Sequence, residues 1–225
     1  MVAAVPTPAS AANTQSAHRS RPFVLLASRS PRRRALLAEH DIPHESIQPG
    51  FEDGVLVPGA VSPAQWVASL AYLKAWAGAA QPEARAEGGR IVLGADTACL
   101  LNDRLIGTPR NAAEAEGIIR SFACTEHDVL TGVAMLDLRG HDGPLENLPE
   151  SRRHIFTDRA RVRFGELTDA QISEYLSSTQ WEGKAGAYNL SERISAGWPI
   201  HFEGDHTTIM GLPMTALVKR LDRMD

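Results

Sequence analysis

The chain has few cysteines and no long apolar run, and both absences limit what kind of protein it can be. Only Cys99 and Cys124 occur among 225 residues, too few for a disulfide framework or a cysteine-based metal centre, so both are expected to be reduced, packed thiols. No segment approaches the roughly 20 apolar residues that cross a bilayer, and the first residues lack the apolar core of a secretory signal. We therefore expect a soluble cytoplasmic protein that does not bind membranes.

A large excess of charge of either sign is also lacking. The formal net charge is -4 at pH 7, whereas a general nucleic-acid-binding domain is usually basic. This balance predicts no nucleic-acid partner and favours a small anionic ligand held by a local basic site. No internal repeat is present, and the length suits one domain, or one domain with two lobes.

Residues 1–20 lack acidic side chains and hydrophobic periodicity, and they are rich in Ala, Ser, Thr and Pro. Such a segment has too little apolar surface to pack, so it is predicted to be a disordered N-terminal tail. A transit peptide has a similar composition and is the alternative. The folded domain is expected over residues 21–225.

The first predicted helix has three arginines in its first turn and no acidic residue there. Residues 23–27 predict an apolar strand, and Ser30 and Pro31 are suited to the N-cap and first position of the helix that follows. The arginines at 32–34 therefore lie at the end of the helix where partial positive charge disfavours cations. A bound phosphate, held by backbone N–H groups and arginine, would explain this placement. A solvated basic helix is the alternative.

Two further charged residues are candidates for the same site. Residues 62–79 predict a long helix with Lys74 on or beside its apolar stripe, so the ammonium group needs a partner unless it extends to the stripe's solvated edge. Residues 91–97 predict a central strand ending in Asp96, and ligands bind at such strand ends in open α/β sheets, although a strand-end aspartate can equally cap a turn. With Asp53 or its acidic neighbour, this set suits a triphosphate and Mg²⁺.

The remaining sequence alternates between helices and strands, which indicates the α/β class. Helices are predicted over residues 111–122, 168–178 and 213–221, and strands over residues 129–138 and 154–164. In the last strand apolar residues alternate with Arg159, Arg161 and Arg163. This arginine row is either a solvated sheet face or, as a lesser alternative, a surface for RNA.

Taken in order, six motifs resemble the Maf family, also called the septum-formation-inhibitor family, of nucleoside triphosphate pyrophosphatases. They are residues 28–33 with Leu36-Leu37, Lys74-Ala75, residues 94–97, Thr108-Pro109 with Glu114-Ala115, residues 184–188 and residues 211–213. The resemblance covers nearly everything from Phe23 onward. It implies an elongated, inosine-triphosphatase-like α/β fold, with a twisted mixed sheet flanked by helices, a cleft between two lobes and often a homodimer. It also implies cleavage of a nucleoside triphosphate to monophosphate and pyrophosphate with a divalent metal, Mg²⁺ or Mn²⁺.

The resemblance carries roles onto individual positions. Asp96 would be the proton acceptor or a metal-binding carboxylate, Asp53 a second metal ligand, and Lys74 a phosphate contact at the catalytic centre. The residues that would bind substrate are Ser28, Ser30, Arg32, Arg33, Thr97, Lys184, Tyr188 and Ser191. Among these, Arg33 would contact phosphate, and Arg32 and Thr97 would contribute to substrate choice.

Four positions depart from the family pattern. Asp53 replaces a glutamate and Gly183 replaces an aspartate. Thr108 replaces a lysine, which removes a charge that would neutralise phosphate. Ser191 replaces a glutamine, which removes an amide able to make paired hydrogen bonds to a base.

Two hypotheses for function follow. The leading one is a metal-dependent nucleoside triphosphate pyrophosphatase that clears non-standard or surplus nucleotides, and Lys184 and Tyr188 resemble the dTTP/UTP branch more than the 7-methyl-GTP branch. The alternative is a catalytically impaired nucleotide-binding protein with a regulatory or interaction role. Pyrophosphate release, as opposed to binding without turnover, distinguishes the two.

Overall fold

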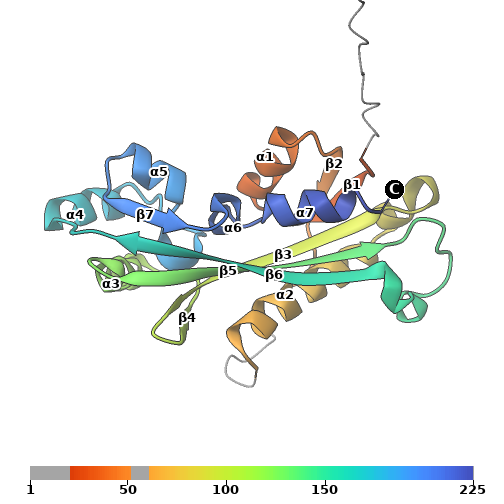
Figure 1. Cartoon of the computed structure of the whole chain (residues 1–225), viewed down its shortest axis with the longest axis horizontal. Helices are drawn as coiled ribbons and strands as arrows, with labels where there is room; N and C mark the ends of the chain where they lie inside the picture. Colours follow the sequence, from red (N-terminus) through yellow and green to blue (C-terminus); the bar gives the residue numbers. More distant parts are fainter. Residues whose placement is uncertain (1–20, 52–60, 225) are drawn as a thin grey trace, which may run out of the picture.

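The computed structural model describes residues 21–51 and 61–224 (Figure 1). Its strands are β1 (Val24–Ala27), β2 (His44–Ile47), β3 (Ile91–Leu101), β4 (Arg104–Ile106), β5 (Glu126–Asp137), β6 (Arg153–Phe164) and β7 (Ile200–Glu203). They form a seven-stranded sheet in the order β2-β1-β3-β5-β6-β7, with β4 also paired to β3. The pairs β1–β2 and β1–β3 are parallel and the others antiparallel, which confirms the predicted mixed sheet.

Helices cover both faces of this elongated sheet. They are α1 (Pro31–Glu39), α2 (Pro63–Ala79), α3 (Ala112–Phe122), α4 (Asp169–Ser177), α5 (Leu190–Ser195), α6 (His206–Met210) and α7 (Met214–Leu221), with 3₁₀ turns η2 (Pro82–Gly88), η3 (Leu145–Asn147), η4 (Glu150–Arg152) and η5 (Ala185–Ala187). Figure 1 shows α1 and α7 on one side of the sheet and α2 on the other. None of the helices in the described ranges is long and apolar enough to cross a bilayer.

The apolar core is divided between the two ends of the sheet. At one end, α1 and α7 pack on one face of β1 and β3, and α2 packs on the other face. At the other end, a separate aromatic core joins α3, α4 and η5 to β5 and β6. Because β5 contributes Val129 to the second core and Val133 to the first, the long strands connect two lobes.

The predicted helix starts are confirmed by their capping hydrogen bonds. The side chains of Ser30, Ser62, Asn111 and Thr168 each accept a hydrogen bond from the backbone N–H three residues on. At α2 and α4 the side chain of the glutamine in the third helical position also accepts a hydrogen bond from the backbone N–H of the cap residue, which completes a capping box. Local sequence alone specifies these starts, because both partners lie within one turn.

Several predicted boundaries and burials are wrong. β3 does not end near Asp96 but continues to Leu101, because its pairing with β5 extends to Leu100 and β4 pairs with its last residues. The segment between the predicted helix at residues 62–79 and the predicted strand at residues 91–97 contains η2, and β4, β7, α5 and α6 were not predicted. Both cysteines are free thiols, yet Cys99 is buried and Cys124 is exposed, so the expectation of packing holds for the first alone. The predicted tail, residues 1–20, lies outside the described residues.

The backbone of α2 lies directly against the sheet. A Cβ atom at Gly94 of β3 would be 2.2 Å from the carbonyl oxygen of Ala71 and 2.5 Å from the nitrogen of Ala75. A Cβ atom at Gly132 of β5 would be 2.3 Å from the carbonyl oxygen of Val67. Distances this short leave no room for any side chain, so glycine at these two strand positions sets the separation of α2 from the sheet.

We expect Gly94→Ala to lower the free energy of unfolding by about 1 to 3 kcal/mol, because the added methyl group forces α2 off the sheet. Gly117→Ala is the matched control. Gly117 is exposed in α3 with open space around its Cβ position, so the alanine raises helix stability by about 0.5 to 1 kcal/mol. Urea denaturation of the two variants and the wild type measures both effects, and a Gly94→Ala variant as stable as the wild type contradicts the packing described here.

Candidate active site

The candidate site lies at a gap in one edge of the sheet. β1 pairs with residues 91–93 of β3 and β4 pairs with residues 99–101, so within the described ranges no strand covers residues 94–98 on that edge. The turn after β1 brings the N-terminus of α1 to this gap. Ligands of open sheets bind beyond the carboxyl ends of parallel strands, and β1 ends at this point.

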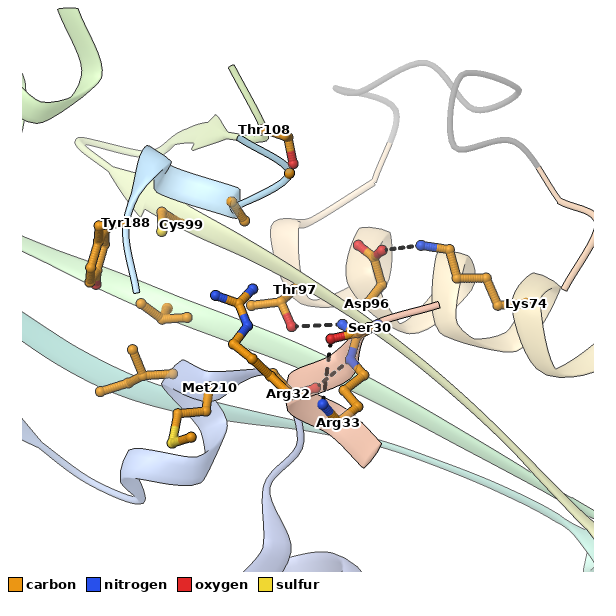
Figure 2. Close-up of a pocket in the computed structure, with 15 residues that line it drawn as sticks. Ser30, Arg32, Arg33, Lys74, Asp96, Thr97, Cys99, Thr108, Tyr188 and Met210 are labelled. Carbon is orange, nitrogen blue, oxygen red and sulfur yellow. Dashed lines mark hydrogen bonds and ion pairs between the residues drawn. The ribbon is translucent and has the colours of Figure 1, made fainter. Parts of the chain in front are cut away.

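A cavity of about 160 Å³ opens at the gap (Figure 2). It is lined by Ser30, Arg32, Arg33, Lys74, Asp96, Thr97, Cys99, Thr108, Val129, Gly183, Ala185, Tyr188, Ile209, Met210 and Gly211. Residues from α1, α2 and β3 thus face residues from η5 and α6, in agreement with the predicted cleft between two lobes. The charged lining residues are three cations and one carboxylate, an arrangement that suits an anionic ligand.

Lys74 and Asp96 form an ion pair at the α2 side of the cavity. The Nζ atom of Lys74 donates to Oδ1 of Asp96 at 2.6 Å, and the two side chains are 12% and 13% exposed (Figure 2). Lys74 was predicted on or beside the apolar stripe of α2, and its ammonium group has the partner that a largely buried position requires. Because the pair is largely withdrawn from water, its attraction is screened much less than that of a surface pair.

Arg33 connects three parts of the chain. Its Nε donates to the carbonyl of Gly211 at 2.8 Å, Nη1 to Oγ of Ser28 at 3.3 Å and Nη2 to Oγ1 of Thr97 at 3.1 Å. Ser28 is buried and outside the cavity lining, and it contacts Arg33. Ser30, by contrast, both caps α1 and lines the cavity. The direct phosphate contact predicted for Arg33 stays a prediction.

Arg32 extends from the first turn of α1 into the cavity (Figure 2). Burial lowers the pKa of Arg32, an effect that Glu192 and Tyr175 oppose. Its guanidinium makes no hydrogen bond to the rest of the described chain, although it carries five donors. Arg34, by contrast, is exposed and donates to the carbonyl of Arg29. Two of the three arginines therefore face the cavity, and Arg32 is the better placed to bind an anion.

The predicted substrate residues near the C-terminus are not all at the cavity. Tyr188 lines it, with its hydroxyl 2.9 Å from Nε2 of His127, and burial raises the pKa of Tyr188. Lys184 instead donates to Glu192 at 2.5 Å and is outside the lining. Ser191 is exposed, also outside the lining, and its Oγ is 3.8 Å from Sδ of Met210. Lys184 and Ser191 are therefore outside the lining of this cavity, and the substrate contacts predicted for them stay predictions.

Several lining residues were not predicted individually. Cys99 contributes a buried thiol whose pKa is raised by burial to about 12, so it stays protonated. Ile209 and Met210 come from α6, and Val129 from β5. The glycine-rich segments around residues 183–186 and 204–211 could have indicated that this part of the chain lines the site, since small residues let the backbone approach a ligand.

Comparison with known proteins identifies the family. The family model described as Maf-like protein matches residues 23–224. This chain belongs to the Maf-like protein family. It is 34% identical over 203 residues to the dTTP/UTP pyrophosphatase of Bacillus mycoides (strain KBAB4), covering 90% of this chain and 95% of that protein. The dTTP/UTP pyrophosphatase of Pelotomaculum thermopropionicum is also 34% identical, over 89% of this chain and 95% of its own length.

A more distant similarity concerns a solved structure. The Ham1 protein of Staphylococcus aureus aligns with a TM-score of 0.38 and 16% identity over 63% of this chain and 71% of that chain. The mixed sheet of this Maf-like protein is established by its own strand pairing and does not depend on that alignment.

The donor set of this Maf-like protein limits how a metal could be held. Asp53, the predicted second metal ligand, lies outside the described residues. Across residues 21–51 and 61–224, no group of three or more His, Cys, Asp or Glu side chains could hold a metal ion. Asp96 is the carboxylate of the cavity lining. One carboxylate among the described residues fits Mg²⁺ that takes other ligands from substrate phosphates and water.

Acid should destabilise this Maf-like protein through His127, which stacks on Phe122 with ring centroids 3.8 Å apart. Burial lowers the pKa of His127 from 6.5 to about 4, and Asp128 opposes this with a smaller effect. As the pH falls, His127 is therefore protonated in the unfolded chain before it is protonated in the folded protein. The stability that depends on a neutral His127 is complete above about pH 6.5. As the pH falls toward 4, the free energy of unfolding decreases by up to about 1.4 kcal/mol per pH unit.

Thermal denaturation across pH 4 to 7 measures this dependence. His127→Phe keeps a ring against Phe122 without a titrating group, so we expect a shallower fall in Tm below pH 6.5. His201→Gln, at an exposed histidine, serves as the control and should keep the wild-type slope. Equal slopes for the wild type and His127→Phe would show that His127 is not the responsible group.

Proposed function

We propose that this Maf-like protein hydrolyses nucleoside triphosphates to the monophosphate and pyrophosphate. The observation that carries the proposal is the cationic cavity in which the Lys74–Asp96 pair lies opposite Arg32, at the N-terminus of α1. Three cations and a helix N-terminus suit the charge of a triphosphate. A carboxylate beside them can accept a proton from an attacking water. The names of the pyrophosphatase relatives support the same reaction.

In the proposed reaction, Arg32 binds the phosphate chain and holds it across the gap in the sheet. Asp96 orients a water molecule and takes its proton as the oxygen attacks phosphorus and the bond to pyrophosphate breaks. Lys74 keeps the Asp96 carboxylate in place and adds positive charge beside the leaving group. Mg²⁺ or Mn²⁺, held by Asp96 together with substrate phosphates, would supply further neutralising charge when bound.

We propose dTTP and UTP as the preferred substrates, and the removal of surplus or non-standard nucleotides as the role. The preference is supported by the names of the relatives and by the position of Tyr188 in the cavity lining. It does not draw on Ser191, which is outside the lining. A cytoplasmic location, expected from the sequence, and a homodimer, suggested by the family resemblance, complete the proposal.

One observation favours the alternative of nucleotide binding without turnover. Thr108 lines the cavity where the family usually has a lysine, so the site has one charge fewer to neutralise a breaking phosphoanhydride. Assays of pyrophosphate and monophosphate release from dTTP, UTP, CTP and dGTP with Mg²⁺ or Mn²⁺ decide between the two. Release by the wild type supports the enzyme, and nucleotide binding without release supports the alternative.

Asp96→Asn should reduce kcat by about 100-fold or more while the protein stays folded, because the amide cannot accept the proton. The assay is pyrophosphate release from dTTP, with circular dichroism as the test of folding. A folded Asp96→Asn variant with wild-type kcat would place the proton acceptor elsewhere.

Arg32→Ala should raise KM by about 10- to 100-fold, the loss expected for hydrogen bonds between a guanidinium and phosphate. Arg34→Ala removes an arginine from the same turn whose side chain is exposed and outside the cavity lining, so its KM should equal that of the wild type. Equal KM values for the two variants would contradict the assignment of Arg32 as the phosphate ligand.

A further inference from the structure

A line of hydrogen bonds runs from the cavity across β3 and β5 to α6, where Thr208 is in turn bonded to β6. Nη2 of Arg33 donates to Oγ1 of Thr97 at 3.1 Å, and this oxygen is 2.9 Å from Oγ1 of Thr131 on the neighbouring strand β5. Oγ1 of Thr131 donates to the carbonyl of Thr208 in α6 at 2.8 Å, and the hydroxyl of Thr208 donates to the carboxylate of Asp158. Thr131 and Thr208 are both fully buried. The line therefore connects Thr97, which lines the cavity, to Thr131 and Thr208, which do not.

The direction of each bond follows from counting protons. A threonine hydroxyl has one proton and two lone pairs, whereas a carbonyl oxygen only accepts. The carbonyl of Thr208 also accepts from the backbone N–H of Gly211 at 3.1 Å. When Thr131 donates its proton to this carbonyl, the bond between the two hydroxyls is donated by Thr97. Thr97 also accepts from Arg33. In this arrangement the proton of Thr97 points to Thr131, and one lone pair of Thr97 is left for a ligand.

The electrostatics of the line reinforce this direction. It begins at the guanidinium of Arg33 and ends at the backbone carbonyl of Thr208, and the hydroxyls of Thr97 and Thr131 both donate away from the cation in this arrangement. Hydrogen bonds that point the same way polarise one another, more strongly in a buried setting.

We propose that Thr131 is a positioning residue that makes Thr97 a hydrogen-bond acceptor toward bound nucleotide. Since phosphate oxygens also accept, Thr97 then faces a hydrogen-bond donor of the nucleoside, either an N–H of the base or a sugar hydroxyl, and not the phosphate chain. Thr97 lines the cavity and Thr131 does not, so Thr131 acts through Thr97. This inference rests on the proposed function for the identity of the ligand.

The test compares three substrates: dTTP, N3-methyl-dTTP without the base N–H, and 2′,3′-dideoxy-TTP without the sugar hydroxyl. We expect the wild type to prefer dTTP in kcat/KM by about 3- to 10-fold over the analogue that lacks the recognised donor, as for one neutral hydrogen bond. Which analogue is disfavoured identifies the donor. A wild type that turns over both analogues as well as dTTP overturns the proposal.

Variants of Thr131 test the positioning role. Thr131→Val keeps the shape of the side chain but removes the acceptor, so the proton of Thr97 is free to turn to the cavity and the preference for dTTP should fall by about 3- to 10-fold. Thr131→Ser restores the acceptor and the preference. Thr131→Ala, which also lacks the hydroxyl, replaces the valine variant if that variant does not fold. An unchanged preference in the folded variant without the hydroxyl overturns the role of Thr131.

Thr208→Val is the matched control. It breaks the bond to Asp158 but keeps the backbone carbonyl that accepts from Thr131, so it should lower Tm and leave the substrate preference unchanged. A Thr208→Val variant that loses the preference as fully as Thr131→Val shows a general loosening of α6 and overturns the proposal. If the wild type hydrolyses no triphosphate, the proposed function fails, and ratios of Kd for the same three nucleotides, measured by calorimetry, still decide the role of Thr131.

Discussion

Direct contact between α2 and the sheet is the constraint on which the candidate site depends. Glycine at positions 94 and 132 lets the helix backbone touch the strands, and any Cβ at either position would overlap helix backbone atoms. Lys74 and Asp96 are carried by these two elements, so their 2.6 Å ion pair is fixed by backbone packing and not by flexible side chains alone. A catalytic carboxylate held in this way needs little reorganisation when a substrate binds.

The same strands that receive α2 also connect two separate cores. β3 and β5 have apolar side chains in both, and the cavity lies where one core gives way to the other. Polar residues replace apolar ones at this boundary, and each buried hydroxyl must then find a partner. Thr97, Thr131 and Thr208 satisfy one another in a line that crosses the sheet. The polar boundary thus joins α1, the sheet and α6 into one site.

Features that depend on neighbouring residues could be predicted from the sequence. Ser30, Ser62, Asn111 and Thr168 were identified as helix caps because their partners lie three residues away. Helical spacing predicted Lys74 on or beside the apolar stripe of α2, and the ion pair with Asp96 shows the partner that its ammonium group has. The position of Asp96 was predicted less well: the apolar run appeared to end there, whereas the strand continues because β5 pairs with it along nearly its whole length. Pairing between distant strands leaves no mark in a short stretch of sequence.

The sequence by itself determined the family, the helix starts and the residue types of the site, because motif order, capping and amphipathic spacing are local properties of the chain. Only the tertiary structure decided which of these residues meet. It brought Arg32, Lys74 and Asp96 to one cavity, turned Lys184 to Glu192 and left Ser191 exposed. It also brought Thr97 next to Thr131, and Thr131 next to the carbonyl of α6 on which the donor direction proposed for Thr97 depends. The physical reason is that side-chain contacts across a sheet depend on strand register, which distant parts of the chain set together.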